Sequence, residues 1–201
     1  MARHRTFLNV MATQNDEAEL WLRARRNDGA AFAALFDLHH ARVYARALGL
    51  LGGTHDAEDT AAAAFFELWR KRQSVRLVSG SVLPWLLVTT VNLSRNARRG
   101  TFRYRQLIHD LPRGPAPSSP DIEESDARQR LASSLGRLGP VDEALFVLTV
   151  LEDVPITQAA QAVGLKPSTA RVRLHRARAR LRDELDDLDP RVRPAMERNP
   201  L

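Results

Sequence analysis

Apolar residues recur along the first third of the chain at the spacing of amphipathic helices. The large apolar side chains follow one another at intervals of three, four or seven residues. Asn27-Asp28-Gly29 and Gly52-Gly53-Thr54 interrupt this pattern as turns. Thr54 or Asp56 has the side chain to cap the helix that follows the second turn. Helices are therefore expected over residues 16–26, 29–51 and 54–72.

The helical pattern resumes after a polar loop over residues 73–81. The β-branched run Val88–Val91 by itself favours a strand, but the helical context on both sides favours a helix over 82–99. Residues 101–122 then hold four prolines and two adjacent serines, which is typical of an extended linker. Further helices are expected over residues 121–138 and 140–151.

The stretch Pro155–Arg182 predicts two short helices joined by a turn. The first helix runs to Val163, and Gly164 can adopt the left-handed conformation that ends a helix. Pro167 or Ser168 then opens the second helix. Two short helices with a glycine turn between them form a helix-turn-helix. The buried stripe of the second helix is expected to consist of Ala170, Leu174, Ala177 and Leu181.

These elements predict an all-α fold of two small helical domains joined by a flexible Pro-rich linker, the second domain being the helix-turn-helix. Because the linker offers little apolar surface, we expect the two domains to move independently. The expected divisions are a mobile tail over 1–15, an N-terminal domain over 16–100, the linker over 101–122, a C-terminal domain over 123–185 and a polar tail over 186–201.

The second helix of this motif carries six arginines between residues 171 and 182 and no acidic residue. A solvated helix face usually mixes both signs, so the uniform charge favours contact with DNA. The whole chain has a net charge of +6 and only two lysines, and arginine is the better donor to phosphates and guanine edges. The residues expected to contact duplex DNA are Ser168, Thr169, Arg171, Val172, Arg173, His175 and Arg176.

The rest of the composition excludes several classes of function. The chain has no cysteine, which excludes disulfides and thiol redox chemistry. No apolar run is long enough to cross a bilayer, and the basic start lacks the apolar core of a signal peptide. We find no paired serine, histidine and acid and no phosphate-binding glycine loop. We therefore expect an intracellular protein that is not an enzyme and needs no cofactor or metal.

Three stretches, taken together, point to a known family. The acidic run His55–Asp59 is followed by the aromatic Phe65–Arg70, and Trp85-Leu86 leads through Asn92-Leu93 to Arg98-Arg99. The third stretch, Leu138–Arg182, contains the helix-turn-helix. With these features in this order, the chain resembles the extracytoplasmic-function (ECF) sigma factors, the small two-domain class of bacterial transcription initiation factors.

The resemblance implies that the protein binds core RNA polymerase and promoter DNA. The N-terminal domain would bind the polymerase and single-stranded −10 DNA, and the C-terminal domain would bind duplex −35 DNA. Capturing unstacked bases requires stacking and base-edge hydrogen bonds, which an asparagine can make, while arginines hold phosphates. The residues implied are Asp56, Glu58, Asp59, Phe65 and Trp69 for the polymerase, and Asn92, Arg95, Arg98 and Arg99 for the −10 DNA.

The family further implies a cytoplasmic protein that joins the nucleoid in holoenzyme, a possible anti-sigma partner, and a loop over 73–81 that captures a −10 base. Some alternatives remain open. Trp85 fits core packing better than base contact, and Asn92 fits a helix-internal bond equally well. The acidic run fits a helix start or a polymerase contact better than a metal site. The protein could also be a helix-turn-helix regulator that does not replace sigma, or, given Ala61–Ala63, a sigma-like protein that sequesters an anti-sigma factor.

Overall fold

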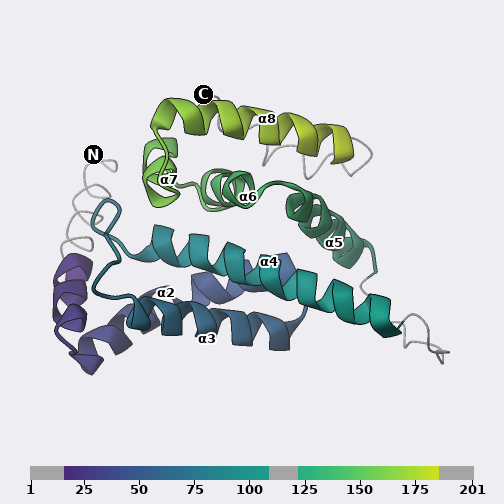
Figure 1. Ribbon diagram of the computed structural model, residues 1–201. Coiled ribbons are helices and arrows are strands. Elements are labelled where there is room, and N and C mark those ends of the chain that lie inside the picture. The colour runs from purple at the N-terminus through teal and green to yellow at the C-terminus, as the bar shows by residue number, and fades with distance from the viewer. Residues whose placement is uncertain (1–15, 109–121, 186–201) are drawn as a thin grey trace, which may run out of the picture.

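The structure is a computed structural model that describes residues 16–108 and 122–185 (Figure 1). Within these ranges the chain is helical, and the only strand-like feature is an isolated antiparallel bridge between Val78 and Ser81. The all-α prediction is confirmed. The elements are a helix over 16–25, α2 (Gly29–Leu51), α3 (Thr54–Arg70), α4 (Leu83–Ile108), α5 (Ile122–Arg137), α6 (Pro140–Phe146), the π-helical turn η1 (Val147–Leu151), α7 (Ile156–Ala162) and α8 (Pro167–Leu185).

Local signals explain where the first long helices begin and end. The Asp28 carboxylate caps α2 by accepting a hydrogen bond from the Ala31 backbone N–H at 3.0 Å, and that bond, together with Arg23, lowers the pKa of Asp28. Gly52 ends α2 in the left-handed conformation at φ +77°. The predicted cap of α3 is wrong. Gly53 is the N-cap residue and makes no side-chain bond, so Thr54 already lies inside the helix.

The helices form two layers with α4 between them (Figure 1). Below α4 lie α2 and α3, which pack on each other and on α4 to form the N-terminal domain. Its core holds Trp21, Leu35, Phe65, Leu68 and Leu86, all nearly excluded from solvent. The α5–α8 helices form the C-terminal domain above α4. Burial of the apolar faces of these helices in the two domains is the main source of their stability.

The two domains pack against each other, which differs from our expectation that they move independently. The reason is that α4 is apolar on two sides. Leu86 faces the N-terminal core, whereas Leu87 and Val91 are fully buried among residues of the C-terminal domain. Because each large apolar side chain contributes about 1.5–3 kcal/mol on burial, this contact favours a closed arrangement. The C-terminal residues in these shared clusters include Leu135, Leu145, Phe146, Leu148 and Leu174.

The predicted linker is shorter than expected at its N-terminal end. The α4 helix continues to Ile108, so residues 101–108 are helical and not extended. The four prolines of the linker fall within 109–121, which lies outside the described residues, as do the predicted tails over 1–15 and 186–201. In the described part of the chain, no helix combines the length and the apolar character needed to cross a membrane.

Candidate nucleic-acid and polymerase interfaces

The helix-turn-helix has the predicted geometry. Gly164 adopts φ +71° after α7, and the Leu165 N–H donates to the Ala160 carbonyl at 2.8 Å, which closes the turn. Ala170, at the start of α8, packs on Ala159 and Ala160 of α7. The predicted stripe is confirmed, because all four of its residues are buried. These four are Ala170, Leu174, Ala177 and Leu181.

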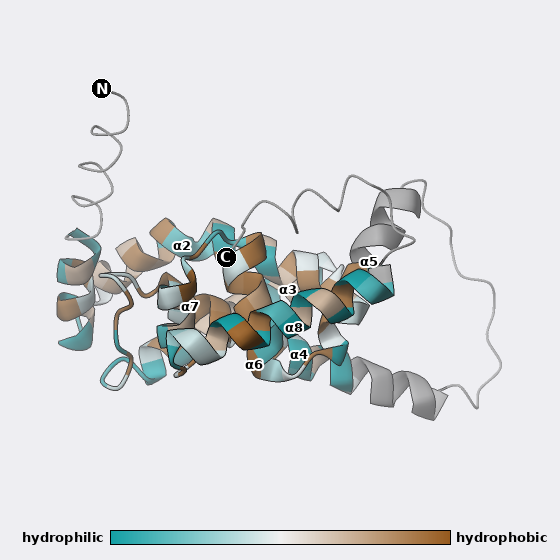
Figure 2. Ribbon diagram, turned by 90° about the horizontal axis from the view of Figure 1, so that it is seen from above, coloured by the Kyte–Doolittle hydropathy of each residue, from teal (hydrophilic) through white to brown (hydrophobic). Residues whose placement is uncertain are grey.

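The opposite face of α8 is open to solvent. The helix is the outermost element of the C-terminal domain in Figure 1, and the view from above in Figure 2 shows mainly hydrophilic residues along it. Val172 is the exception, an apolar residue that is 51% exposed at the centre of this face. We call this surface the α8 face. Its exposed members are Ser168, Thr169, Arg171, Val172, His175 and Arg176.

Arg173 was expected to contact DNA, but it points elsewhere. Its Nε donates to the Asp142 carboxylate at 2.6 Å, and about two fifths of its side chain is exposed. This pair joins α8 to the start of α6 inside the C-terminal domain. Arg173 therefore helps to position the helix, and its contact with DNA stays a prediction.

The α4 residues expected to hold −10 DNA divide into two groups. Asn92 and Arg99 are exposed. Arg95 and Arg98 are instead 13% and 21% exposed, and both donate to the buried Glu143 carboxylate of the C-terminal domain. In this closed arrangement Arg95 and Arg98 cannot also hold a phosphate. Trp85 packs against the N-terminal core, as its sequence context favoured.

The acidic surface of α3 is exposed as predicted, but its aromatic neighbour is different. Asp56, Glu58 and Asp59 all face solvent. Phe65, which was expected to contact the polymerase, is only 3% exposed and belongs to the core, whereas Phe66 is 65% exposed. The correction could have been made from the sequence, because position 65 continues the buried α3 stripe of residues 57, 61, 64 and 68.

The C-terminal end of α3 is held by aromatic and charged contacts. Trp69 is half-buried, meets Phe32 edge-to-face at 4.9 Å between ring centroids, and lies under the Arg72 guanidinium at 4.3 Å. Hydrogen bonds from Arg70 and Lys71 lower the pKa of Glu67 to about 2. Trp69 is thus held by these contacts and presents only part of its side chain to a partner.

The alanines in the middle of α3 have a packing role. Ala61 and Ala64 are fully buried in the N-terminal domain, and Ala62 is exposed. Small side chains at buried positions allow α3 to lie close to α2. The run therefore offers little more than a methyl group to a partner, and the neighbouring acids and Phe66 remain the candidate contacts.

A buried carboxylate from the first helix anchors the loop over residues 73–81. Oε1 of Glu17 accepts hydrogen bonds from Nε2 of His39 at 2.8 Å, the Ser81 hydroxyl at 2.9 Å and the Val82 backbone N–H at 2.8 Å. Ser79 and Gly80 have positive φ angles and form the turn that precedes this anchor. Sequence reasoning missed Glu17, because its partners lie 22 to 65 residues away.

Metal ligation finds no support in the described ranges. There, no group of three or more histidine and acidic side chains gathers closely enough to hold an ion. His55 and Asp59 approach each other at 4.0 Å on the surface of α3, and both are strongly exposed.

Comparison with known proteins agrees with this geometry. Residues 35–103 match Sigma-70 region 2, which covers most of α2 and all of α3, and residues 128–181 match Sigma-70 region 4, which includes the helix-turn-helix. The chain is 30% identical over 172 residues to the RNA polymerase sigma factor CarQ of Myxococcus xanthus, covering 84% of this chain and 98% of CarQ. The chain is an ECF sigma factor.

Other relatives of this sigma factor belong to the same class. It is 35% identical over 152 residues to the ECF RNA polymerase sigma factor SigE of Mycolicibacterium smegmatis, which covers 73% of this chain and 58% of SigE. It is 24% identical to the ECF RNA polymerase sigma factor SigW of Bacillus subtilis, covering 82% of this chain and 94% of SigW. The sigma factor thus spans little more than half of SigE but nearly all of CarQ and SigW.

Solved structures share the fold of this sigma factor. CnrH in complex with the cytosolic domain of CnrY matches with a TM-score of 0.59 at 22% identity, covering 87% of this chain and 99% of CnrH. The sigma factor RpoE in complex with the anti-sigma factor NepR from Bartonella quintana matches with a TM-score of 0.51 at 22% identity, covering 79% of this chain and 98% of RpoE.

Proposed function

We propose that this sigma factor binds core RNA polymerase, directs it to −35 and −10 promoter elements and assists the separation of the strands. The observation that carries the proposal is the α8 face, an exposed polar and arginine-rich helix surface in a helix-turn-helix that matches Sigma-70 region 4. A helix of this kind fits the major groove, where the residues near its N-terminus reach the base edges.

The two DNA elements would be read by different means. On the α8 face, Arg176 lies nearly opposite the buried stripe and is placed to reach base edges, whereas Arg171 lies on the flank and favours phosphate. Asn92 on α4 has both a donor and an acceptor for an unstacked base. Arg95 and Arg98 would join it only after the domains separate. The protein supplies binding energy and no chemistry of its own, because the polymerase forms the phosphodiester bonds.

The polymerase contact is assigned to the exposed surface of α3. Asp56, Glu58 and Asp59 supply negative charge, and Phe66 supplies an exposed apolar side chain further along the same helix. A few aromatic anchors usually carry most of the energy of a protein interface. We therefore include Phe66 in this surface and exclude Phe65.

Regulation by an anti-sigma factor fits the same chain. RpoE of Bartonella quintana was solved with an anti-sigma factor, and CnrH was solved with the cytosolic domain of CnrY. We infer that this chain, which shares their fold, binds a partner of this kind, and we place it in the bacterial cytoplasm, where polymerase and promoter DNA are present.

Run-off transcription with purified core polymerase on genomic fragments tests the proposal. We expect discrete transcripts only when both the polymerase and this protein are present. A regulator that does not replace sigma would change transcription only in the presence of another sigma factor. A protein that only sequesters an anti-sigma factor would give no transcripts at all, and either result would overturn the proposal.

A further inference from the structure

Two glutamates of the C-terminal domain are each held by two arginines of the N-terminal domain. Glu143 on α6 is fully buried, and Arg95 Nη1 donates to its Oε2 at 2.8 Å while Arg98 Nη2 donates to its Oε1. The same arginines also donate to backbone carbonyls across the interface, at 2.7 Å to Leu138 and 2.8 Å to Ala132. We call this group, Arg95, Arg98 and Glu143, the inner clamp.

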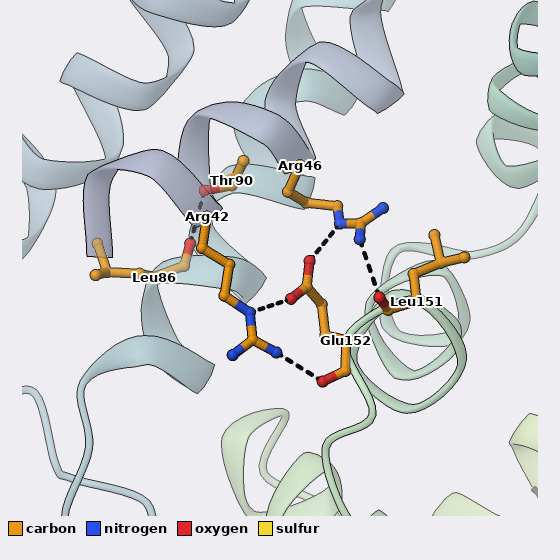
Figure 3. Close-up of polar contacts among 6 residues, drawn as sticks. All are labelled: Arg42, Arg46, Leu86, Thr90, Leu151 and Glu152. Carbon is orange, nitrogen blue, oxygen red and sulfur yellow. Dashed lines mark hydrogen bonds and ion pairs between the residues drawn. The ribbon is translucent and has the colours of Figure 1, made fainter. Parts of the chain in front are cut away.

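The second group, Arg42, Arg46 and Glu152, is the outer clamp (Figure 3). Glu152 follows η1 and is nearly buried, and its two carboxylate oxygens accept from Nε of Arg42 at 2.5 Å and Nε of Arg46 at 2.6 Å. Arg42 and Arg46 lie on α2. Nη2 of Arg42 also donates to the backbone carbonyl of Glu152 at 2.7 Å, and Nη2 of Arg46 donates to the carbonyl of Leu151 at 3.1 Å. The outer clamp shares no residue with the proposed contacts to DNA.

The chemistry of the inner clamp matters because a carboxylate and a phosphate are alternative ligands for one guanidinium. A carboxylate is planar and a phosphate is tetrahedral, but both have negatively charged oxygens that accept paired, charge-assisted N–H bonds from arginine. In the closed arrangement Arg95 and Arg98 are only 13% and 21% exposed, and their bonded donors point at Glu143 and at backbone carbonyls, so neither side chain is open to a phosphate. Closing the domains and binding nucleic acid through α4 therefore exclude each other.

We propose that the Glu143 and Glu152 surface of the C-terminal domain is a docking surface for the arginines of α4 and α2, and that it competes with nucleic-acid phosphate for Arg95 and Arg98. The unbound protein is then closed, with part of its own DNA-binding surface covered. The outer clamp and the apolar contacts of Leu87 and Val91 hold the same arrangement. The proposal rests on the proposed function for the binding of nucleic acid through α4.

The expected change in affinity for DNA follows from an equilibrium between a closed and an open form of the protein. If only the open form binds single-stranded DNA through α4, the apparent dissociation constant equals the intrinsic one divided by the open fraction. Removing one partner of a buried pair shifts an equilibrium by more than about a hundredfold. A variant that breaks a clamp should thus tighten the binding of DNA by the unbound protein until the open form predominates.

The experiment uses the full chain without polymerase. Since the chain has no cysteine, dyes can be attached through Glu19→Cys and Gln161→Cys, two exposed positions in different domains. Resonance energy transfer then reports the separation of the domains, and fluorescence anisotropy reports the affinity for an oligothymidine. The test variant is Glu152→Gln, and the matched control is Asp153→Asn, which removes the same charge from the adjacent exposed residue.

We expect Glu152→Gln to lower the energy transfer and to tighten oligothymidine binding by about tenfold, and Asp153→Asn to change neither. Adding oligothymidine to the unaltered protein should also lower the energy transfer, which tests the competition without any substitution. Low transfer in the unaltered protein, or separation of the domains without a gain in affinity, would overturn the proposal. Because no polymerase is present, this result is independent of the run-off assay, and either proposal can fail alone.

Discussion

Replacing Glu17 with alanine should destabilise the N-terminal domain, because Glu17 is the buried carboxylate of the first helix. The change removes one buried acceptor that three donors share, at His39, Ser81 and Val82. The Val82 N–H is fully buried and would keep no acceptor, whereas the partly exposed Ser81 hydroxyl can turn to water. The loop over 73–81 would then lose the bond that holds its end to the first helix.

The magnitude follows from these contacts. An unsatisfied buried N–H costs about 1–3 kcal/mol, and a hydrogen bond to a charged group such as that of His39 contributes about 1.5–3 kcal/mol. Removing the carboxylate also relieves the cost of burying a charge, which offsets part of the loss. We therefore expect Glu17→Ala to lower the free energy of unfolding by about 2–4 kcal/mol.

Urea denaturation followed by circular dichroism measures this difference. Glu17→Gln keeps an oxygen acceptor and should cost only about 1 kcal/mol. Glu19→Ala, an exposed carboxylate on the same helix, should stay within about 0.5 kcal/mol of the unaltered protein. A loss of less than about 1 kcal/mol for Glu17→Ala would show that this carboxylate does not anchor the loop.

Two further predictions test local features. Gly164→Ala should lower the free energy of unfolding by about 1–2 kcal/mol, because φ is +71° at this position. Gly49→Ala inside α2 should instead raise the free energy of unfolding by about 0.5–1 kcal/mol. Chemical denaturation measures both changes, and a change in the same direction for both variants would contradict this reasoning. An NMR titration should give Glu67 a pKa of about 2, lowered from its ordinary value of 4.5. The pairing of Glu67 therefore stabilises the fold fully at pH values above 4.5, and this stabilisation is lost as the pH falls toward 2. Arg70→Gln should raise that pKa, and an unchanged value would rule out Arg70 as the cause.

The helices and the α8 face were predictable because their signals are local. Turn residues bound α2 at both ends, and the spacing of Ala170 and Leu174 identifies the buried side of α8 without reference to the rest of the chain. Phe65 and Phe66 could have been distinguished by the same periodicity. The sequence prediction assigned Phe65 to the polymerase contact because Phe65 and Phe66 were taken together as one aromatic feature.

The closed arrangement could not be predicted, because its signals are distant in sequence. Glu152 meets arginines 106 and 110 residues away, and Glu143 meets arginines 45 and 48 residues away. The run around Leu87 and Val91 indicates a second buried side of α4, but it does not identify the helices that cover it. The basic character of Arg95 and Arg98 fits phosphate as well as carboxylate, so the family resemblance assigned them to DNA.

The central claim is that the α8 face guides polymerase to the −35 element. The most direct measurement is the affinity of holoenzyme for its promoter with Arg176→Ala and with the matched control Arg182→Ala, an exposed arginine near the other end of α8. We predict that Arg176→Ala weakens promoter binding by about tenfold to a hundredfold and relaxes preference at one −35 base pair, while Arg182→Ala keeps that preference. Equal affinity and equal base preference for Arg176→Ala and the unaltered protein would contradict the account.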